Sequence, residues 1–156
     1  MKKAILSLVT TLVIGYYSFS QELSPYIKVG ELTESIQSAY DKVISNLEGD
    51  NFTILGTYNP SNKSSLKVVV FTRSDIKNKV VQVADRGALA AAFKVGLVKL
   101  DGKVVVSYTN PDYIFRAYLR DNYVTFQSTF EKFSADVKTT FSSIGNEFTP
   151  FGGTVK

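Results

Sequence analysis

Hydrophobic and polar residues alternate most clearly over residues 93–109, where two apolar runs flank Asp101-Gly102. Asp-Gly accepts the positive φ angles of a tight type I′ turn, so this stretch predicts a β-hairpin. Pairing about the turn places Leu97 opposite Val106, and a shift by one residue would exchange the two faces of the hairpin. One face then holds Phe93, Val95, Leu97, Val104, Val106 and Tyr108. The other face holds Lys94, Gly96, Lys103, Ser107 and Thr109, with Val98 and Val105 among them.

The segment before the hairpin predicts three further strands and a long helix. The strands are expected over residues 24–32, 52–58 and 66–72. The third of them is rich in β-branched residues, which favour extended structure. Apolar residues at helical spacing predict a helix over residues 33–48. Thr33 is its expected N-cap, and Gly49 is expected to end it in the left-handed conformation.

Two short segments connect the third strand to the hairpin. A short helix is expected from Ser74, as its cap, to Asp85-Arg86-Gly87, where a glycine closes it. Residues 88–92 are ambiguous, because alanine favours helix while Gly87 interrupts it and a strand follows. We expect an early strand there, leading directly into the hairpin.

Two helices are predicted after the hairpin. Asn110 as cap and Pro111 at the first helical position begin one of them. The second is long, over residues 122–144, and residues 148–153 form a tail apolar enough to dock on the domain. The long helix carries a mostly aromatic stripe at seven-residue spacing, made of Tyr123, Phe126, Phe130, Phe133, Val137 and Ile144.

The aromatic stripe of the long helix has three interpretations. It covers the sheet of its own subunit, it packs against a partner, or it lines a lipid-like cavity beneath the helix. Coiled-coil seams prefer aliphatic residues, so packing within the subunit is the favoured interpretation.

The order of elements predicts an α+β two-layer sandwich with a mainly antiparallel sheet, helices on one face and a long C-terminal helix. Most links are short enough for neighbouring strands to run antiparallel. One domain is expected over residues 21–120, and residues 121–156 are expected to pack on it as the C-terminal helix and tail.

Residues 1–20 predict a secretory signal peptide. Lys2 and Lys3 precede an apolar run over residues 4–17, and Ser18-Phe19-Ser20 places small residues at the cleavage positions before Gln21. The cut is not followed by cysteine, so a lipoprotein anchor is excluded. The alternative is an uncleaved N-terminal anchor. Either interpretation predicts an exported protein, periplasmic or secreted, and cleavage would leave no membrane span.

Composition excludes several kinds of chemistry. The 156 residues contain no Cys and no His, and the only Met is the initiator, so zinc, haem and copper sites are not expected. Cys and Ser–His nucleophile systems are excluded for the same reason. The net charge of +4 falls to +2 without Lys2 and Lys3, which is too weak to indicate nucleic-acid binding. No cofactor, no metal and no catalytic residue is predicted.

Three segments together resemble a known bacterial family. They are the strand at residues 66–72, the hairpin with Val95-Gly96-Leu97 and Asp101-Gly102-Lys103-Val104, and the following Val106-Ser107-Tyr108-Thr109-Asn110-Pro111. As a group they resemble the domain-of-unknown-function family 302, structurally the TT1751-like group, over residues 25–119. The resemblance implies a TATA-binding-protein-like α+β fold and allows a homodimer. It implies no activity. The long helix and the tail look like additions to the shorter family members.

Six residues are candidates for binding a ligand. The first helix after the hairpin carries Asn110, Tyr113, Arg116 and Arg120, which could hold an anion or a polar headgroup near the helix start. The competing interpretation is a capped surface helix on which Asp112 and Arg116, four residues apart, form an ordinary ion pair.

The other two candidates are Arg86 and Tyr108. Arg86, in Asp85-Arg86-Gly87, could orient a ligand carboxylate, but a solvated pair at a helix exit is the more common role. Tyr108 lies on the predicted core face, where its hydroxyl needs a partner from the backbone or from a ligand.

The favoured function is a non-catalytic envelope or periplasmic module that binds a small or amphipathic ligand or a partner protein. The alternatives are a metal-independent enzyme that uses Asp, Glu, Lys or Tyr, which predicts carboxylates converging in one cleft, and a structural, oligomerising protein.

Overall fold

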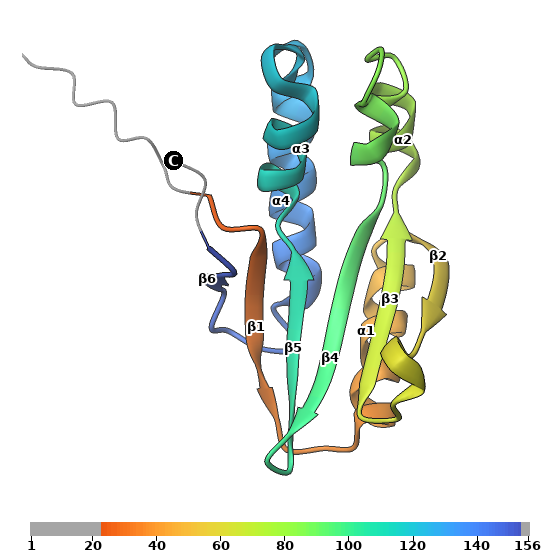
Figure 1. Cartoon of the computed structure of the whole chain (residues 1–156), viewed down its shortest axis with the longest axis vertical. Helices are drawn as coiled ribbons and strands as arrows, with labels where there is room; N and C mark the ends of the chain where they lie inside the picture. Colours follow the sequence, from red (N-terminus) through yellow and green to blue (C-terminus); the bar gives the residue numbers. More distant parts are fainter. Residues whose placement is uncertain (1–22, 154–156) are drawn as a thin grey trace, which may run out of the picture.

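The computed structural model describes residues 23–153 and shows the predicted α+β architecture (Figure 1). Six antiparallel strands form one sheet in the order β2-β3-β4-β5-β1-β6. The strands are β1 (Tyr26–Leu32), β2 (Thr53–Tyr58), β3 (Leu66–Thr72), β4 (Phe93–Leu100), β5 (Lys103–Thr109) and β6 (Thr149–Phe151). The predicted signal peptide, residues 1–20, lies outside the described residues.

Helices cover one face of this sheet, so the two-layer arrangement expected from the sequence is confirmed. In the view of Figure 1, α1 and α4 lie behind the strands, while α2 and α3 continue upward from the ends of β3 and β5. The helices are α1 (Ile36–Gly49), α2 (Ser74–Val80), α3 (Pro111–Leu119) and α4 (Gln127–Phe141). Shorter 3₁₀ turns are η1 (Pro60–Asn62), η2 (Gly87–Ala90) and η3 (Arg120–Phe126).

The hairpin of β4 and β5 has the predicted register. Leu97 pairs with Val106, and Val95 pairs with Tyr108. The turn residues Asp101 and Gly102 have φ angles of 50° and 79°, the left-handed values that a type I′ turn requires at both central positions. All six residues of the predicted core face are buried: Phe93, Val95, Leu97, Val104, Val106 and Tyr108.

The aromatic stripe of α4 packs within the subunit, as favoured from the sequence. Phe133 lies against Phe93 of the sheet with ring centroids 4.7 Å apart, and Phe130 stacks on Phe115 of α3 at 4.2 Å. Phe141 stacks on Tyr108 at 5.2 Å. Each such aromatic pair adds to the large gain from burying the rings. These contacts attach α4 to both the sheet and α3, so α4 is part of the core.

The predicted limits of the first helix were wrong at both ends. Ser35, not Thr33, is the N-cap of α1, because its hydroxyl accepts a hydrogen bond from the backbone N–H of Ser38 at 3.0 Å. Gly49 is the last residue of the helix, and Asn51 adopts the left-handed conformation with a φ of 62°. Asparagine tolerates that region better than most residues, so it replaces glycine in this role.

The segment between β3 and β4 also differs from the prediction. Arg73, not Ser74, occupies the N-cap position of α2, and the helix already ends at Val80. The expected early strand at residues 88–92 is wrong: the chain forms η2 there. A Cβ atom on Gly87 would overlap the carbonyl oxygen of Val80, so only glycine lets the chain fold back closely on α2.

The long helix predicted over residues 122–144 is two elements. The chain leaves α3 at Arg120, whose φ of 49° ends the regular helix, and forms η3 before α4 begins at Gln127. The guanidinium of Arg116 lies over the ring of Tyr123 at 4.2 Å and holds this turn against α3. The helix ends at Phe141, short of Gly145.

The C-terminal tail lies along the edge of the sheet. It forms β6, which pairs with the start of β1 and places the ring of Phe151 5.5 Å from that of Tyr26. A bulge in β1 leaves the carbonyl of Val29 free to accept the backbone N–H of Glu147 at 2.9 Å. The Glu147 carboxylate also pairs with Lys28 at 3.0 Å.

Candidate functional site

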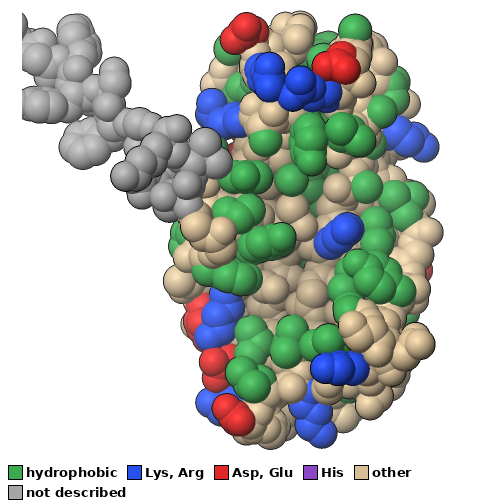
Figure 2. Space-filling view, in the orientation of Figure 1, with side chains coloured by type: hydrophobic (Ala, Val, Ile, Leu, Met, Phe, Trp, Pro, Cys, Tyr) green, Lys and Arg blue, Asp and Glu red, His purple; other side chains and the backbone are tan. Residues whose placement is uncertain are grey.

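The face of the sheet opposite α1 and α4 is open. Figure 2 shows this face hollowed along its middle, with hydrophobic side chains on both sides and one basic side chain within the hollow. Side chains alternate along each strand, so the residues here are those excluded from the core. They include the second face predicted for the hairpin, with Gly96 paired to Ser107 and Val98 paired to Val105.

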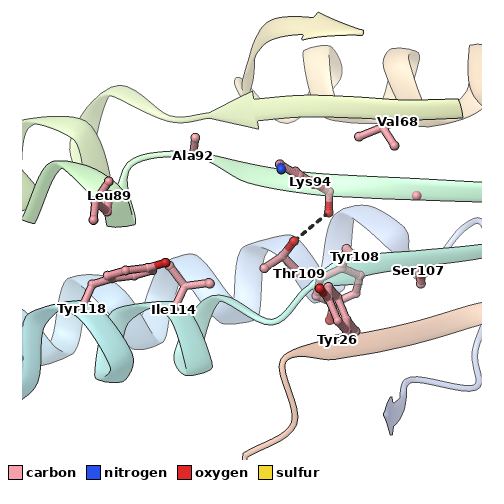
Figure 3. A pocket seen from close by; sticks show the side chains of 11 residues that line it. Tyr26, Val68, Leu89, Ala92, Lys94, Ser107, Tyr108, Thr109, Ile114 and Tyr118 are labelled. Carbon is pink, nitrogen blue, oxygen red and sulfur yellow. Dashed lines mark hydrogen bonds between the residues drawn. The ribbon is translucent and has the colours of Figure 1, made fainter. Parts of the chain in front are cut away.

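The hollow contains a groove of about 540 Å³. It lies where β4 begins and β5 ends, at the end of the hairpin away from its turn. Ladder pairing between these strands ends at Val95 and Tyr108. Beyond that pair the strands are joined by a long hydrogen bond, 3.4 Å, from the Thr109 hydroxyl to the Lys94 carbonyl. The groove therefore lies where β4 and β5 separate, each continuing into a different part of the helical layer (Figures 1 and 3).

The two walls of the groove come from different elements. In Figure 3, Leu89 of η2, Ala92 and Val68 of β3 lie along one side. Ile114 and Tyr118 of α3 lie along the other side, followed by Tyr26 of β1. Leu89 is 61% exposed, so its side chain offers apolar surface to the groove.

The depth of the groove depends on two small residues. Gly96 and Ser107 face each other across β4 and β5 and form the floor. A Cβ atom added to Gly96 would meet the Ser107 hydroxyl oxygen at 3.6 Å, an ordinary van der Waals distance. A larger residue would therefore be tolerated by the backbone at this position, and its side chain would project into the groove.

The aromatic core lies behind the point where the strands separate. The rings of Phe93 and Phe115 are 5.5 Å apart in an edge-to-face arrangement, and Phe133 packs against both of them. All three side chains are fully buried. Because these rings fill the space between β4 and α3, the groove ends on packed side chains.

Among residues 23–153, Lys94 is the one charged side chain that lines the groove, and it extends from β4 between the two walls (Figure 3). It forms no salt bridge within residues 23–153. The other polar side chains of this lining are Ser107, Thr109 and the tyrosines Tyr26, Tyr108 and Tyr118. Among the described residues, the groove thus combines apolar walls with a single cation.

Of the six residues predicted to bind a ligand, Tyr108 and Asn110 contribute to pockets. Tyr108 borders the groove, and both residues border a smaller pocket of about 300 Å³ at the start of α3. Burial, with the charge of Asp112, raises the pKa of Tyr108 to about 12, so its phenol stays protonated. Asn110 caps α3 by accepting the Asp112 N–H at 3.2 Å and donates to the Ser24 carbonyl at 2.9 Å.

The other four predicted residues lie outside both of these pockets. Arg86 pairs with its neighbour Asp85 at 3.0 Å on the surface. Arg116 stacks on Tyr123, and the expected ion pair with Asp112 is absent, because the Asp112 carboxylate instead accepts the Ser134 hydroxyl at 2.7 Å. Tyr113 and Arg120 line neither pocket. The start of α3 is thus already capped by residues of the chain itself.

The groove residues that the sequence did not single out are mostly small or apolar. The predicted register puts four of them, Lys94, Gly96, Ser107 and Thr109, on the face of the hairpin away from the core. The sequence does predict helices on one side of the sheet only, and this would have indicated that the second face of the hairpin is uncovered. The walls could not be assigned in this way, since Tyr26, Val68, Leu89, Ile114 and Tyr118 come from distant parts of the chain.

Carboxylates do converge elsewhere, around Arg73. Its guanidinium donates to both oxygens of Asp75, at 2.8 and 2.9 Å, and to Asp136 at 2.7 Å. It also lies over the rings of Phe52 and Phe133, at 5.1 and 4.9 Å. We call Arg73, Asp75 and Asp136 the Arg73 cluster. With Asp50 and Lys132, it borders a polar pocket of about 440 Å³.

The Arg73 cluster is arranged for stability. Desolvation alone would raise the pKa of Asp75 and that of Asp136, but hydrogen bonds and the charges of Arg73 and, for Asp136, Lys132 hold both pKa values below their ordinary range. Both carboxylates are therefore ionised and neutralised, whereas a general acid near neutral pH needs a raised pKa. The cluster joins α2 to α4 and to the aromatic core.

Within residues 23–153 there is no group of three or more Asp and Glu side chains placed to hold a metal ion. In the same residues, no helix combines the length and the apolar content that a bilayer crossing requires.

Comparison with known proteins identifies the class of fold. No protein-family model matches the sequence, and no curated protein matches it. Three solved chains match the structure. One is described as the crystal structure of the uncharacterized conserved protein DUF302 from Bacillus stearothermophilus, with a TM-score of 0.52 and 9% sequence identity. The match covers 76% of this chain and 93% of that one. The resemblance predicted from the hairpin is therefore confirmed for the fold.

Replacing Arg73 with leucine should destabilise the protein by about 2 kcal/mol at pH 7, because two ionised carboxylates lose their partner. The side chain of Arg73 is only 13% exposed. The loss should shrink at acid pH. The lowered pKa values mean that the cluster stabilises the fold above the unfolded-state pKa of about 4, and that this stabilisation disappears as pH falls through the folded values.

Urea unfolding of wild type and R73L at pH 7 and near pH 2.5 measures this effect. The matched control is K132A. Lys132 also pairs with Asp136, but its side chain is 71% exposed, so this substitution should change stability by less than about 0.5 kcal/mol. A pH-independent difference between R73L and wild type would contradict the proposed role of the ion pairs.

Proposed function

We propose that this protein is a non-catalytic binding module whose small or amphipathic ligand occupies the groove on the open face of the sheet. The observation that carries this proposal is a concave site of about 540 Å³, lined from β1, β3, β4, β5, η2 and α3. That volume lies within the range of about 300–1,000 Å³ typical of small-molecule sites. Such sites are mostly apolar with a few polar groups, as this groove is.

The chemistry of the lining supports binding rather than catalysis. No carboxylate of the described part of the chain lines the groove, and the buried Tyr108 beside it has a pKa raised to about 12. A general acid–base pair near neutral pH would need groups that titrate there. The carboxylates that converge around Arg73 are ionised, paired and on a different part of the molecule.

We also propose that the module is exported. This part of the proposal rests on residues 1–20, where two lysines, an apolar run and small residues before Gln21 follow the pattern of a cleavable signal.

Replacing Gly96 with leucine should remove ligand binding by filling the floor of the groove. The expected result is at least a tenfold loss of affinity for Nile red, a neutral apolar dye, measured by fluorescence titration. Gly56→Leu is the matched control, because Gly56 also lies within a strand, has open space around its Cβ position and does not line the groove. Urea unfolding of both variants checks that the fold is retained.

The proposal fails if wild-type protein does not bind the dye, or if G96L and G56L lose the same affinity. Native mass spectrometry of protein purified from the cells that make it supplies a second readout. We expect a bound small molecule on wild type and none on G96L.

The proposed export predicts that the mature protein begins at Gln21. Intact mass measurement of the natural protein should show the loss of residues 1–20, and cell fractionation should find it outside the cytoplasm. A cytoplasmic protein that retains Met1 to Ser20 would contradict this part of the proposal.

A further inference from the structure

We infer that the ligand of the groove is an aliphatic monocarboxylate whose carboxylate pairs with Lys94. This inference rests on the proposed function, because it assigns the chemistry of the same site. It begins from the charge of the groove: of the eleven described residues that line it, Lys94 is a cation, the other ten are uncharged and none is an acid.

Lys94 differs from three of the four other lysines of the sheet, which have partners, and from Lys99, which forms no salt bridge with a described residue but does not line the groove. Lys28 pairs with Glu31 at 2.9 Å and with Glu147 at 3.0 Å, and Lys103 pairs with Glu31 at 3.0 Å. Lys67 lies over the ring of Tyr40 at 4.8 Å. Within residues 23–153, no carboxylate forms a salt bridge with Lys94, and its ammonium does not lie over an aromatic ring. The hollow therefore presents a cation that no acid of the described chain neutralises.

The single charge favours a carboxylate over a phosphate. A lysine ammonium is a compact point charge, while phosphate recognition commonly uses the two-pronged donors of arginine, and no arginine is among the described residues that line the groove. A phosphate monoester would also leave excess negative charge against one lysine. A carboxylate is balanced by Lys94, and the hydroxyls of Ser107 and Tyr118 are further donors in the same lining.

The walls favour an aliphatic remainder. Leu89, Ala92 and Val68 on one side, and Ile114 with the ring of Tyr118 on the other, offer apolar contact on both flanks of Lys94 (Figure 3). Leu89 is exposed, so a chain lying beside it would remove apolar surface from water. The groove volume of about 540 Å³ leaves room for a chain of about ten carbons.

Competition against Nile red tests the assignment with four matched amphipaths, decanoate, 1-decanol, decyltrimethylammonium and decyl phosphate, each kept below its solubility limit or micelle-forming concentration. On wild type, decanoate should compete at a concentration at least tenfold lower than decanol, and decyltrimethylammonium should compete worst. Decyl phosphate should not exceed decanoate. Raising the salt concentration should reduce the advantage of decanoate over decanol, because ions screen the pairing with an exposed lysine.

Lys94→Gln should abolish the preference for decanoate and leave competition by decanol within about twofold of wild type. Lys94→Glu should favour decyltrimethylammonium instead. Lys99→Gln is the control, since Lys99 lies on the same strand, does not line the groove and should keep the wild-type order.

The possible outcomes separate the inference from the proposed function. Equal competition by decanoate and decanol on wild type, or a decanoate preference that K94Q retains, overturns the inference while the binding groove stands. Stronger competition by decyl phosphate overturns the assignment to a carboxylate. Failure of the wild type to bind Nile red or any of the four amphipaths overturns both proposals.

Discussion

The structure depends on the alternation of side chains in one hairpin. Asp101 and Gly102 fix the turn, and the turn fixes which residues of β4 and β5 point to each side. Phe93 and Val95 then lie under helices, while Lys94 and Gly96 lie on the open face. Successive side chains of a strand point to opposite faces of the sheet, so the pairing register of β4 and β5 specifies both the core and the groove. A sequence change that shifted the register would exchange their positions.

The aromatic core also explains why the groove exists. Phe93, Phe115 and Phe133 occupy the space where β4 and α3 meet, and the strands separate next to them. The Arg73 cluster joins α2 to α4 on the covered side. These contacts fix the helical end of the domain, so the walls contributed by η2 and α3 are positioned before a ligand arrives. A preformed wall reduces the ordering cost of binding.

Much of the fold follows from local signals in the sequence. The hairpin, the order of the elements, the Asn110 cap and the burial of the α4 stripe all depend on period, turn chemistry or cap chemistry over a few residues. The errors arose where several signals compete within a short distance. Ser35 and Thr33 are both acceptable caps, and the approach of Gly87 to Val80 favours a 3₁₀ turn over the strand expected at residues 88–92.

The groove was harder to predict, because it exists only where one face of the sheet is left without helices. Sequence reasoning favoured charged groups near the start of α3, where the chemistry is visible in one stretch. In the structure, Asn110 and Asp112 bind other parts of the chain, and Arg116 stacks on Tyr123. The groove instead combines Lys94 and Gly96 with walls from elements far apart in the sequence. Such a site requires the sheet order, which local patterns do not contain.

The most direct test of the two-faced hairpin uses the absence of cysteine from the chain. Single cysteines introduced as Ser107→Cys and Val106→Cys place neighbouring thiols on opposite faces of β5. Under native conditions, a thiol-reactive reagent should label S107C at least a hundredfold faster than V106C, and decanoate should slow the labelling of S107C alone. Equal rates at the two positions, or faster labelling of V106C, would contradict the account.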